Sequence, residues 1–320
     1  MKKFIKENLS FLIFIALMIL IVEVELPYYI EAPGGTINLS KRIDKDYNKK
    51  NGSLNMLYVT EYKGNLVTVL LSKVIKSWDL YEISDQQISD EDTHDIHIRN
   101  KVMLENSIQN ATFVAYNSAG KKIDIKGKEN IVIATTKDNG IKIGDNIISI
   151  DGKDVEDIST IKEHLNALNK DDEVTINIKR DNKEKEVTIK LEEDKVIGIM
   201  IITNYIYETE DDLDIAFRSG EGGSSGGLIL ALGIYSQITG TDILKGRNIA
   251  GTGTIDSEGN IGEIDGIKYK IAGAAKKHMD IVLVSPYNYD EAKKEIEKNH
   301  YNIELVKVNT FKEAIDYLTK

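Results

Sequence analysis

The chain has 320 residues, which is enough for two domains that each bury a hydrophobic core. Its formal net charge of −11 and isoelectric point near 5.1 argue against a nucleic-acid partner, because such a partner requires a basic surface. The absence of cysteine excludes disulfides and thiolate metal sites, but it does not identify the cellular compartment.

Residues 1–27 are typical of an N-terminal signal anchor. Three lysines precede an apolar run of 14 residues, Leu9 to Val22, which only Ser10 interrupts. The run is short for a transmembrane helix of about 20 residues, although flanking apolar residues extend it. A cleaved signal peptide is the alternative, but residues 23–27 contain no cleavage site of small residues. The lysines before the span predict a single-pass protein of the cell membrane whose remainder is extracytoplasmic.

Residues 28–119 are expected to hold an exposed juxtamembrane connector, as far as residue 50, and then the first part of an α/β domain. Residues 53–61 and 65–71 read as two strands around a turn, and apolar residues at helical spacing predict a helix over 101–118.

His94 and His97 raise the question of a metal site. Their acidic surroundings favour a solvated loop, and no third ligand is apparent, so we predict no metal.

Residues 120–193 are expected to form a separate β-rich domain. Strands are predicted at 130–135 and in a hairpin of 173–180 and 184–191 that turns about Asp181 and Asn182. Between them, Ser159 or Thr160 is predicted to cap a helix that runs to Leu168.

Residues 221–227 (EGGSSGG) form the most informative stretch. Four glycines bracket two serines, and an apolar run follows, so a glycine-rich turn leads into a helix. Backbone N–H groups at a helix start lack partners within the helix and can hold a developing anion. A serine there could be a nucleophile beside an oxyanion hole, although such loops also bind phosphate.

Residues 251–268 predict a strand, a tight turn, a short strand and a helix that begins near Lys268. Further strands are expected at 281–285 and 303–308, and helices at 290–297 and 311–318. This alternation is typical of an α/β core.

Two of these stretches resemble the Lon-type Ser/Lys peptidases. Residues 222–228 (GGSSGGL) resemble the family's nucleophile motif G-G-P-S-A-G-L, and residues 252–268 resemble its T-G-…-I-G-G-[LI]-K motif. Ser225 and Lys268 are 43 positions apart (268 − 225), in keeping with the family's spacing. Ser224, Gly226 and Asp265 depart from the family's proline, alanine and glycine, and the first departure leaves two adjacent serines, of which Ser225 aligns.

The resemblance extends to residues 52–66, which are similar to the family's opening hairpin, to 105–111, similar to its first helix, and to 214–217, similar to the strand before the nucleophile loop. It implies a Lon-like peptidase domain that is split into residues 28–119 and 194–320.

The block K-x-G-D-x-I-x-x-I-D-G at residues 142–152 closely resembles the hallmark of bacterial PDZ domains. The resemblance implies an inserted PDZ domain at 120–193. Its expected carboxylate-binding turn is the glycine loop at Gly127 and Lys128, beside Ile131 in the strand that follows.

The Lon resemblance implies that Ser225 is the nucleophile and Lys268 the general base. A free lysine has a pKa near 10.4 and is almost entirely protonated at pH 7, so a basic lysine must be desolvated. Burial against Ile264 and Ile271 is the expected cause. The plain alternative is an exposed helix lysine, the role expected of Lys270. Thr252 is a candidate for positioning the lysine, and the amides of Gly222, Gly223 and Gly226 are candidate oxyanion donors.

These observations predict an α/β peptidase with an inserted PDZ domain and one transmembrane helix. The resemblance implies a serine endopeptidase that acts outside the cytoplasm on peptide or membrane-associated protein substrates and needs no cofactor. It does not decide whether the protein forms a homo-oligomer. No Walker A pattern occurs, so no ATP requirement is expected.

Two other functions remain open. One is a PDZ adaptor on an inactive peptidase scaffold. The other is an α/β-hydrolase-like esterase, since residues 223–227 also satisfy G-x-S-x-G and His278 or His300 could serve as its base.

Overall fold

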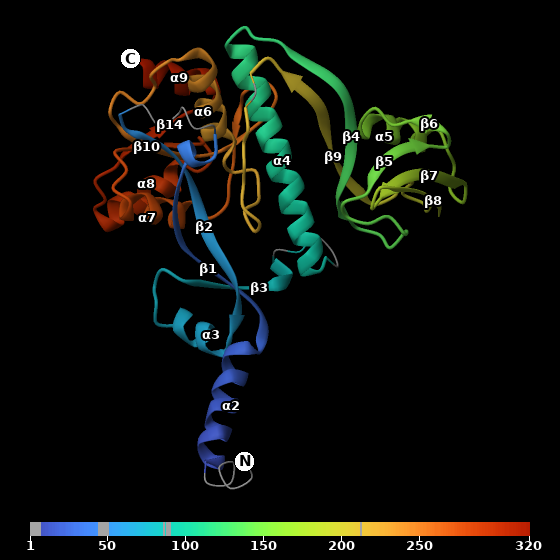
Figure 1. Cartoon of the computed structure of the whole chain (residues 1–320). Coiled ribbons are helices and arrows are strands. Elements are labelled where there is room, and N and C mark those ends of the chain that lie inside the picture. The colour runs from blue at the N-terminus through green and yellow to red at the C-terminus, as the bar shows by residue number, and fades with distance from the viewer. Residues whose placement is uncertain (1–7, 44–50, 86, 88–90, 212) are drawn as a thin grey trace.

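The computed structural model describes residues 8–43, 51–85, 87, 91–211 and 213–320. Figure 1 shows an N-terminal helix at one end of the molecule, a long two-stranded arm, a body that contains the C-terminus, and a second sheet on the far side of a long helix.

The main sheet has six strands in the order β14-β13-β10-β2-β1-β3. In this sheet β2, β10, β13 and β14 run parallel to one another, whereas β1 runs antiparallel to β2 and β3. The bounds are β1 (Glu25–Asn38), β2 (Ser53–Asn65), β3 (Asp79–Glu82), β10 (Asn248–Thr252), β13 (Ile281–Val284) and β14 (Glu304–Lys307). A small ribbon of β11 (Thr254–Ile255) and β12 (Ile261–Gly262) follows β10.

Side chains alternate between the two faces of each strand, so this sheet has an apolar layer on both faces, and helices cover both. Met56 and Ile249 belong to the cluster on one face, with α4 (Thr93–Ser118), α6 (Gly227–Thr239) and α9 (Phe311–Thr319). Leu57 and Ala250 belong to the other, with α7 (Ile267–Lys276) and α8 (Tyr289–Asn299). Groups from α6 and α7 can therefore meet only at an edge of the sheet.

The second sheet lies across α4 from the body (Figure 1), in the order β8-β7-β5-β4-β9, with β6 paired to β5. Its core is almost entirely isoleucine, valine and leucine. The predicted hairpin is confirmed, and Asp181 and Asn182 have positive φ angles of 52° and 59° at its turn. The bounds are β4 (Ile123–Thr135), β5 (Asn146–Ile150), β6 (Lys153–Asp154), α5 (Ile158–Asn166), β7 (Glu173–Arg180), β8 (Lys183–Lys190) and β9 (Ile199–Thr209).

Three local predictions were wrong. Residues 65–71 were predicted to be a strand, but Leu66–Ser72 form the helix α3, because the Asn65 and Thr68 side chains form a capping box at its start. The expected connector is mostly β1, which buries Ile30. The expected strand at 214–217 is reduced to one bridge between Ile215 and Ile43.

The helix of the second sheet also begins earlier than predicted. Asp157, rather than Ser159 or Thr160, is its N-cap, and the Asp157 carboxylate accepts hydrogen bonds from the Ser159 and Thr160 amides. An ionised carboxylate is a stronger acceptor than a hydroxyl at a helix start.

At the N-terminal end, α2 (Leu9–Glu23) leaves most of its large apolar side chains exposed. Within the described part of the chain, no helix is both long and apolar enough to cross a membrane. The lysines at positions 2, 3 and 6 lie outside the described residues.

Candidate active site

Ser225 lies in the turn between Gly223, which has a left-handed φ of 86°, and the first residue of α6, Gly227. The loop is held against β2 and α4. A side chain at Gly226 would meet the Met56 sulfur at 2.9 Å, and one at Gly227 would meet the Ser107 hydroxyl at 3.0 Å. The serine is half-buried at a helix start, as the sequence predicted.

The two peptide planes around Ser225 are fixed through their carbonyls. The Ser224 carbonyl accepts hydrogen bonds from the Ser107 hydroxyl at 3.1 Å and the Gly227 amide at 3.3 Å. The Ser225 carbonyl accepts from the Thr252 hydroxyl at 3.1 Å and the Gly253 amide at 2.9 Å.

A trans peptide directs its N–H opposite to its C=O, so the Ser225 and Gly226 amides point away from these partners. Among the described residues, neither amide donates to an acceptor. The two N–H groups are neighbours at the N-terminus of α6, where the helix dipole also favours an anion. This pair can hold an oxyanion. The sequence indicated Gly226, but the amide of the serine itself was missed.

The other proposed oxyanion donors fare differently. The Gly223 amide donates to the Asn100 carbonyl at 2.8 Å, so it is occupied and the prediction for Gly223 was wrong for this conformation. Gly222 also packs against Asn100, and it is an exposed residue three positions before Ser225. Thr252 is fully buried, and its hydroxyl bonds to the Ser225 carbonyl rather than to a lysine.

Lys268 does not have the environment that the sequence predicted. Its side chain is 41% exposed and forms an ion pair with the Asp79 carboxylate, which also accepts a hydrogen bond from the Tyr269 hydroxyl. Burial alone lowers the pKa of Lys268, but the hydrogen bond and charge of Asp79 outweigh burial and hold this pKa above its usual value. In this structure Lys268 is therefore exposed and ion-paired rather than buried as predicted, because β3 supplies a carboxylate that no motif indicated.

The buried lysine of α7 is Lys270, which the sequence analysis took for an exposed one. It is only 4% exposed, and burial lowers its pKa to about 8 against the opposing charges of Asp265, Glu31 and Glu61. Within the described residues, the Lys270 ammonium has charged neighbours but no hydrogen-bond partner. Lys270 follows Ile267 by three positions and precedes Ala274 by four, so helical periodicity could have placed it on the buried face.

Lys270 shares its surroundings with Glu31, a buried glutamate of β1. The Glu31 carboxylate lies against Gly266, where an added side chain would clash with it, and Gly266 is one turn before Lys270. Burial raises the pKa of Glu31 to about 7, and repulsion by Glu61, its partner on β2, adds to this. Glu31 was not predicted as a site residue, because the sequence does not show that β1 pairs with β2 beneath α7.

His278 and His300 lie far from Ser225. Both are exposed at the carboxyl ends of α7 and α8. Two residues after His278, the Asp280 carboxylate accepts a hydrogen bond from the backbone amide of Asn248 at the start of β10. Ser225 lies at the opposite end of β10, beside Thr252. This placement argues against a Ser/His esterase. Of the residues the structure describes, no three histidine, aspartate or glutamate side chains are grouped to hold a metal ion.

Two family models match the chain. Residues 129–191 match the PDZ domain model, and residues 203–320 match the model of the Lon protease (S16) C-terminal proteolytic domain. The chain carries a PDZ domain and a Lon-type proteolytic domain. These matches confirm both resemblances and support a serine peptidase with a peptide-binding module.

Two further comparisons were made. No curated protein matches the chain. Among solved structures, the PDZ domain of an SdrC-like protein from Listeria monocytogenes is 26% identical, with a TM-score of 0.21, and the match covers 23% of this chain and 86% of that one.

In the PDZ domain, the predicted carboxylate-binding turn is not a turn. Gly127 and Lys128 lie inside β4 and pair with Ile206 and Tyr205 of β9, after a bulge. Their backbone groups therefore face a neighbouring strand. Ile131 pairs with both β5 and β9 in the middle of the sheet.

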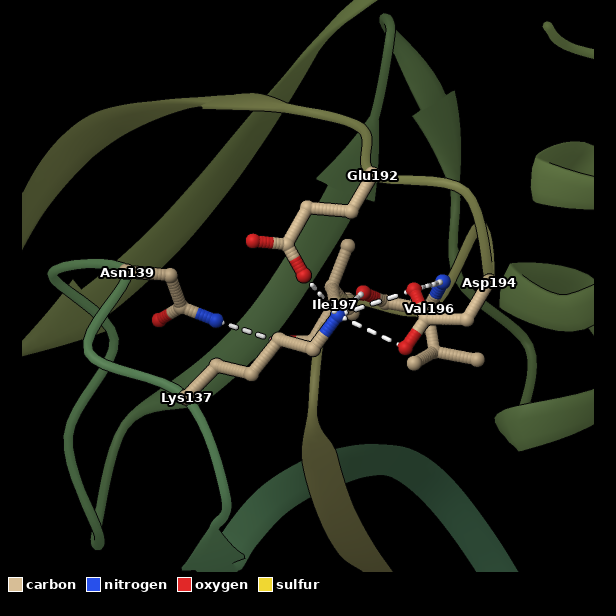
Figure 2. Close-up of polar contacts among 6 residues, drawn as sticks. All are labelled: Lys137, Asn139, Glu192, Asp194, Val196 and Ile197. Atoms are coloured by element: carbon tan, nitrogen blue, oxygen red, sulfur yellow. Dashed lines mark hydrogen bonds and ion pairs between the residues drawn. The ribbon is translucent and has the colours of Figure 1, made fainter. Parts of the chain in front are cut away.

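The turn that precedes β9 is held by several side-chain contacts, which Figure 2 shows. Lys137 Nζ bonds to Glu192 at 2.7 Å, to Asp194 at 2.8 and 2.9 Å, and to the Val196 carbonyl at 3.2 Å. The Asn139 amide donates to the Ile197 carbonyl. Gly198, with φ of 69°, then leads into β9, the edge strand of the sheet.

Proposed function

We propose that this protein is an ATP-independent serine endopeptidase in which Ser225 is the nucleophile and Lys270 is the general base. The observation that carries the proposal is the fixed turn at Ser225, with two amides directed outward, in a domain that matches the model of the Lon protease (S16) C-terminal proteolytic domain. Lys270 is proposed as the base in place of Lys268 because it is buried, whereas Lys268 is exposed and ion-paired with Asp79. Lys270 is 45 positions after Ser225 (270 − 225), only two more than Lys268.

In this mechanism Ser225 Oγ attacks the peptide carbonyl carbon while its proton passes to neutral Lys270 Nζ. The amides of Ser225 and Gly226 bind the oxyanion. Lys270 then protonates the leaving amine, the C–N bond breaks, and an acyl-enzyme remains. Water attacks the ester and gives a proton to Lys270, and Lys270 returns this proton to Ser225 Oγ as the ester C–O bond breaks and the carboxylic acid leaves.

Thr252 and Lys268 take supporting roles in this proposal. Thr252 holds the Ser225 carbonyl and so orients the Gly226 amide. Lys268 forms its ion pair with Asp79 and fastens α7 to β3. The sequence assigned Lys268 the role of the base, and an experiment on both lysines separates the two assignments.

Substrate recruitment is proposed to use the open edge of the PDZ sheet. Ile199 and Ile201 of β9 pack with the same core as α5, and the first half of β9 has a neighbour on one side only. A peptide can add to such an edge as another strand. The Lys137 contacts would keep the turn before β9 in one geometry for the end of the peptide.

Membrane anchoring through residues 1–27, with the catalytic part outside the cytoplasm, remains part of the proposal. It is supported by the apolar composition of α2 and its exposed side chains. Peptides and membrane-associated proteins are the proposed substrates.

A cleavage assay on an unstructured peptide without ATP tests this function. Ser225→Ala should abolish cleavage, and Ser224→Ala, which changes the adjacent hydroxyl of the same turn, should retain it. Absence of cleavage by the wild-type chain, together with binding of the peptide, would support the inactive adaptor instead.

A further inference from the structure

The helix α3 is short, apolar and uncovered. None of its residues is buried, and five apolar side chains from α3 and the following turn are exposed. They recur on one face of the helix and its continuation, at Leu66 (46%), Val67 (36%), Leu70 (56%), Leu71 (41%) and Val74 (77%). Exposed apolar side chains three or four positions apart on a helix form a continuous face, and such a face marks a site that contacts another protein or a membrane.

This face continues into the surface of α2. The side-chain amide of Asn65, at the start of α3, donates to the Val22 carbonyl near the end of α2 at 2.9 Å. Lys63 and Glu25 join the adjacent strand ends with an ion pair of 2.7 Å. Figure 1 shows α3 beside the end of the β1–β2 arm that carries α2, far from both sheets' helices. Exposed apolar side chains of α2 extend the surface: Leu9, Phe11, Leu12, Ile13, Phe14, Ile15, Leu17, Met18, Ile19 and Val22.

Polar and aromatic residues border the same surface. Lys73 and Lys76 are exposed directly after the apolar turns. Trp78 packs edge-on against Tyr62, with ring centroids 5.6 Å apart. Lysine at the edge of an apolar helix face and tryptophan beside it are the residues that fit the headgroup region of a bilayer.

We propose that α3 and the turns as far as Trp78 form a second membrane contact, with the apolar face in the headgroup and acyl boundary of the bilayer that α2 enters. The inference rests on the proposed membrane anchoring. A bilayer fits better than a second copy of the chain, because the apolar surface of α3 is continuous with that of α2, the proposed anchor.

Such a contact would fix the height of the active site. Met56, which lies against Gly226, is joined to Asn65 by an unbroken stretch of β2, or about 30 Å at about 3.3 Å per residue. With α3 held in the bilayer, the arm could not tilt freely about α2. Cleavage would then be directed to segments of membrane-bound substrates at that distance.

The single tryptophan of the chain, Trp78, reports on this contact. The full chain is reconstituted in phosphatidylcholine and phosphatidylglycerol vesicles that carry bromine either high or low on the acyl chain. We expect strong quenching of Trp78 emission by the shallow label and at least about twofold weaker quenching by the deep one, since an interfacial helix lies near the headgroups.

The double substitution Leu70→Glu with Val74→Glu should remove most of this quenching, while α2 keeps the protein in the vesicles. Ile125→Glu, at an exposed apolar residue of β4, is the matched control and should change nothing. Quenching of the wild type that the double substitution leaves intact would overturn the proposal. So would an unquenched Trp78 in protein that floats with the vesicles, including the case in which crosslinking shows two copies joined through α3. Protein that does not float at all would instead refute the membrane anchor.

Discussion

Beside the main sheet, a glutamate of β1 and a lysine of α7 are both buried, whereas in the PDZ domain the ion pairs of Lys137 lie at the surface. Glu31 and Lys270 are 8% and 4% exposed, and burial moves the pKa of each toward neutrality. In the PDZ domain, Lys137 meets Glu192 and Asp194 in a turn open to water. A buried charge destabilises a fold unless it is paired, so the burial of Glu31 and Lys270 costs stability that the exposed pairs of Lys137 do not. Groups buried at such a cost are more often found at functional sites.

The largest expected effect separates the two lysines of α7. Lys270→Ala should lower kcat/KM for an unstructured peptide by roughly 10³-fold or more, because the nucleophile loses its base. Lys268→Ala should lower it much less, since it removes an exposed ion pair. The reverse ranking would restore Lys268 as the base.

A second prediction concerns the free energy of unfolding. The pKa of Lys270 falls from 10.5 to about 8 on folding, which corresponds to about 3 kcal/mol at about 1.36 kcal/mol per unit. Between these two pH values the unfolded chain binds more protons, so stability should rise with pH from about 8 to 10.5.

Lys270→Met should remove this rise and stabilise the Lon-type domain at pH 7, although the proposed dyad predicts that the variant is inactive. Chemical denaturation followed by circular dichroism at pH 7 and pH 10 measures both effects. A Lys270→Met protein less stable than the wild type at pH 7 would show that the ammonium is paired in the folded state.

The third prediction concerns the pair of buried groups. The negative charge of Glu31 raises the pKa of Lys270 against the effect of burial, so Glu31→Gln should shift the acid limb of kcat/KM toward lower pH. Because Glu31 and Lys270 titrate as a coupled pair, the acid limb of the pH–rate profile reports apparent pKa values of the pair and not of either residue alone. A pH–rate profile of both proteins makes the comparison, and a shift toward higher pH would contradict it.

The smallest effect is expected in the PDZ domain. Lys137→Ala removes ion pairs to carboxylates that are 71% and 52% exposed, so it should destabilise the domain by less than about 1 kcal/mol. Thermal unfolding at low and high salt should show the difference shrinking as salt screens the charges. A loss of several kcal/mol would mean that the turn before β9 is a major support of the domain.

The sequence predicted much of this fold because its signals are local. The turn at Asp181 and Asn182, the start of α7 and the order of strands after Thr252 all follow from short patterns. The strand expected at 65–71 failed because Asn65 and Thr68 cap a helix that the β-branched composition concealed.

The candidate site was only partly predictable. Ser225 is placed by its glycine turn, which lies within seven residues of sequence. The choice between Lys268 and Lys270 depends on Asp79 and Glu31, two carboxylates on strands that are about 190 and 240 positions earlier in the chain. Only the packing of α7 on β1 and β2 decides which lysine is buried.

The most direct test of the proposed dyad is the pH dependence of labelling by a serine-reactive fluorophosphonate, located by mass spectrometry. The account predicts that the label is on Ser225, that its rate rises with pH through about 8, and that Lys270→Ala abolishes it while Lys268→Ala does not. A label on Ser224, or a rate that Lys268→Ala abolishes and Lys270→Ala leaves unchanged, would contradict the account.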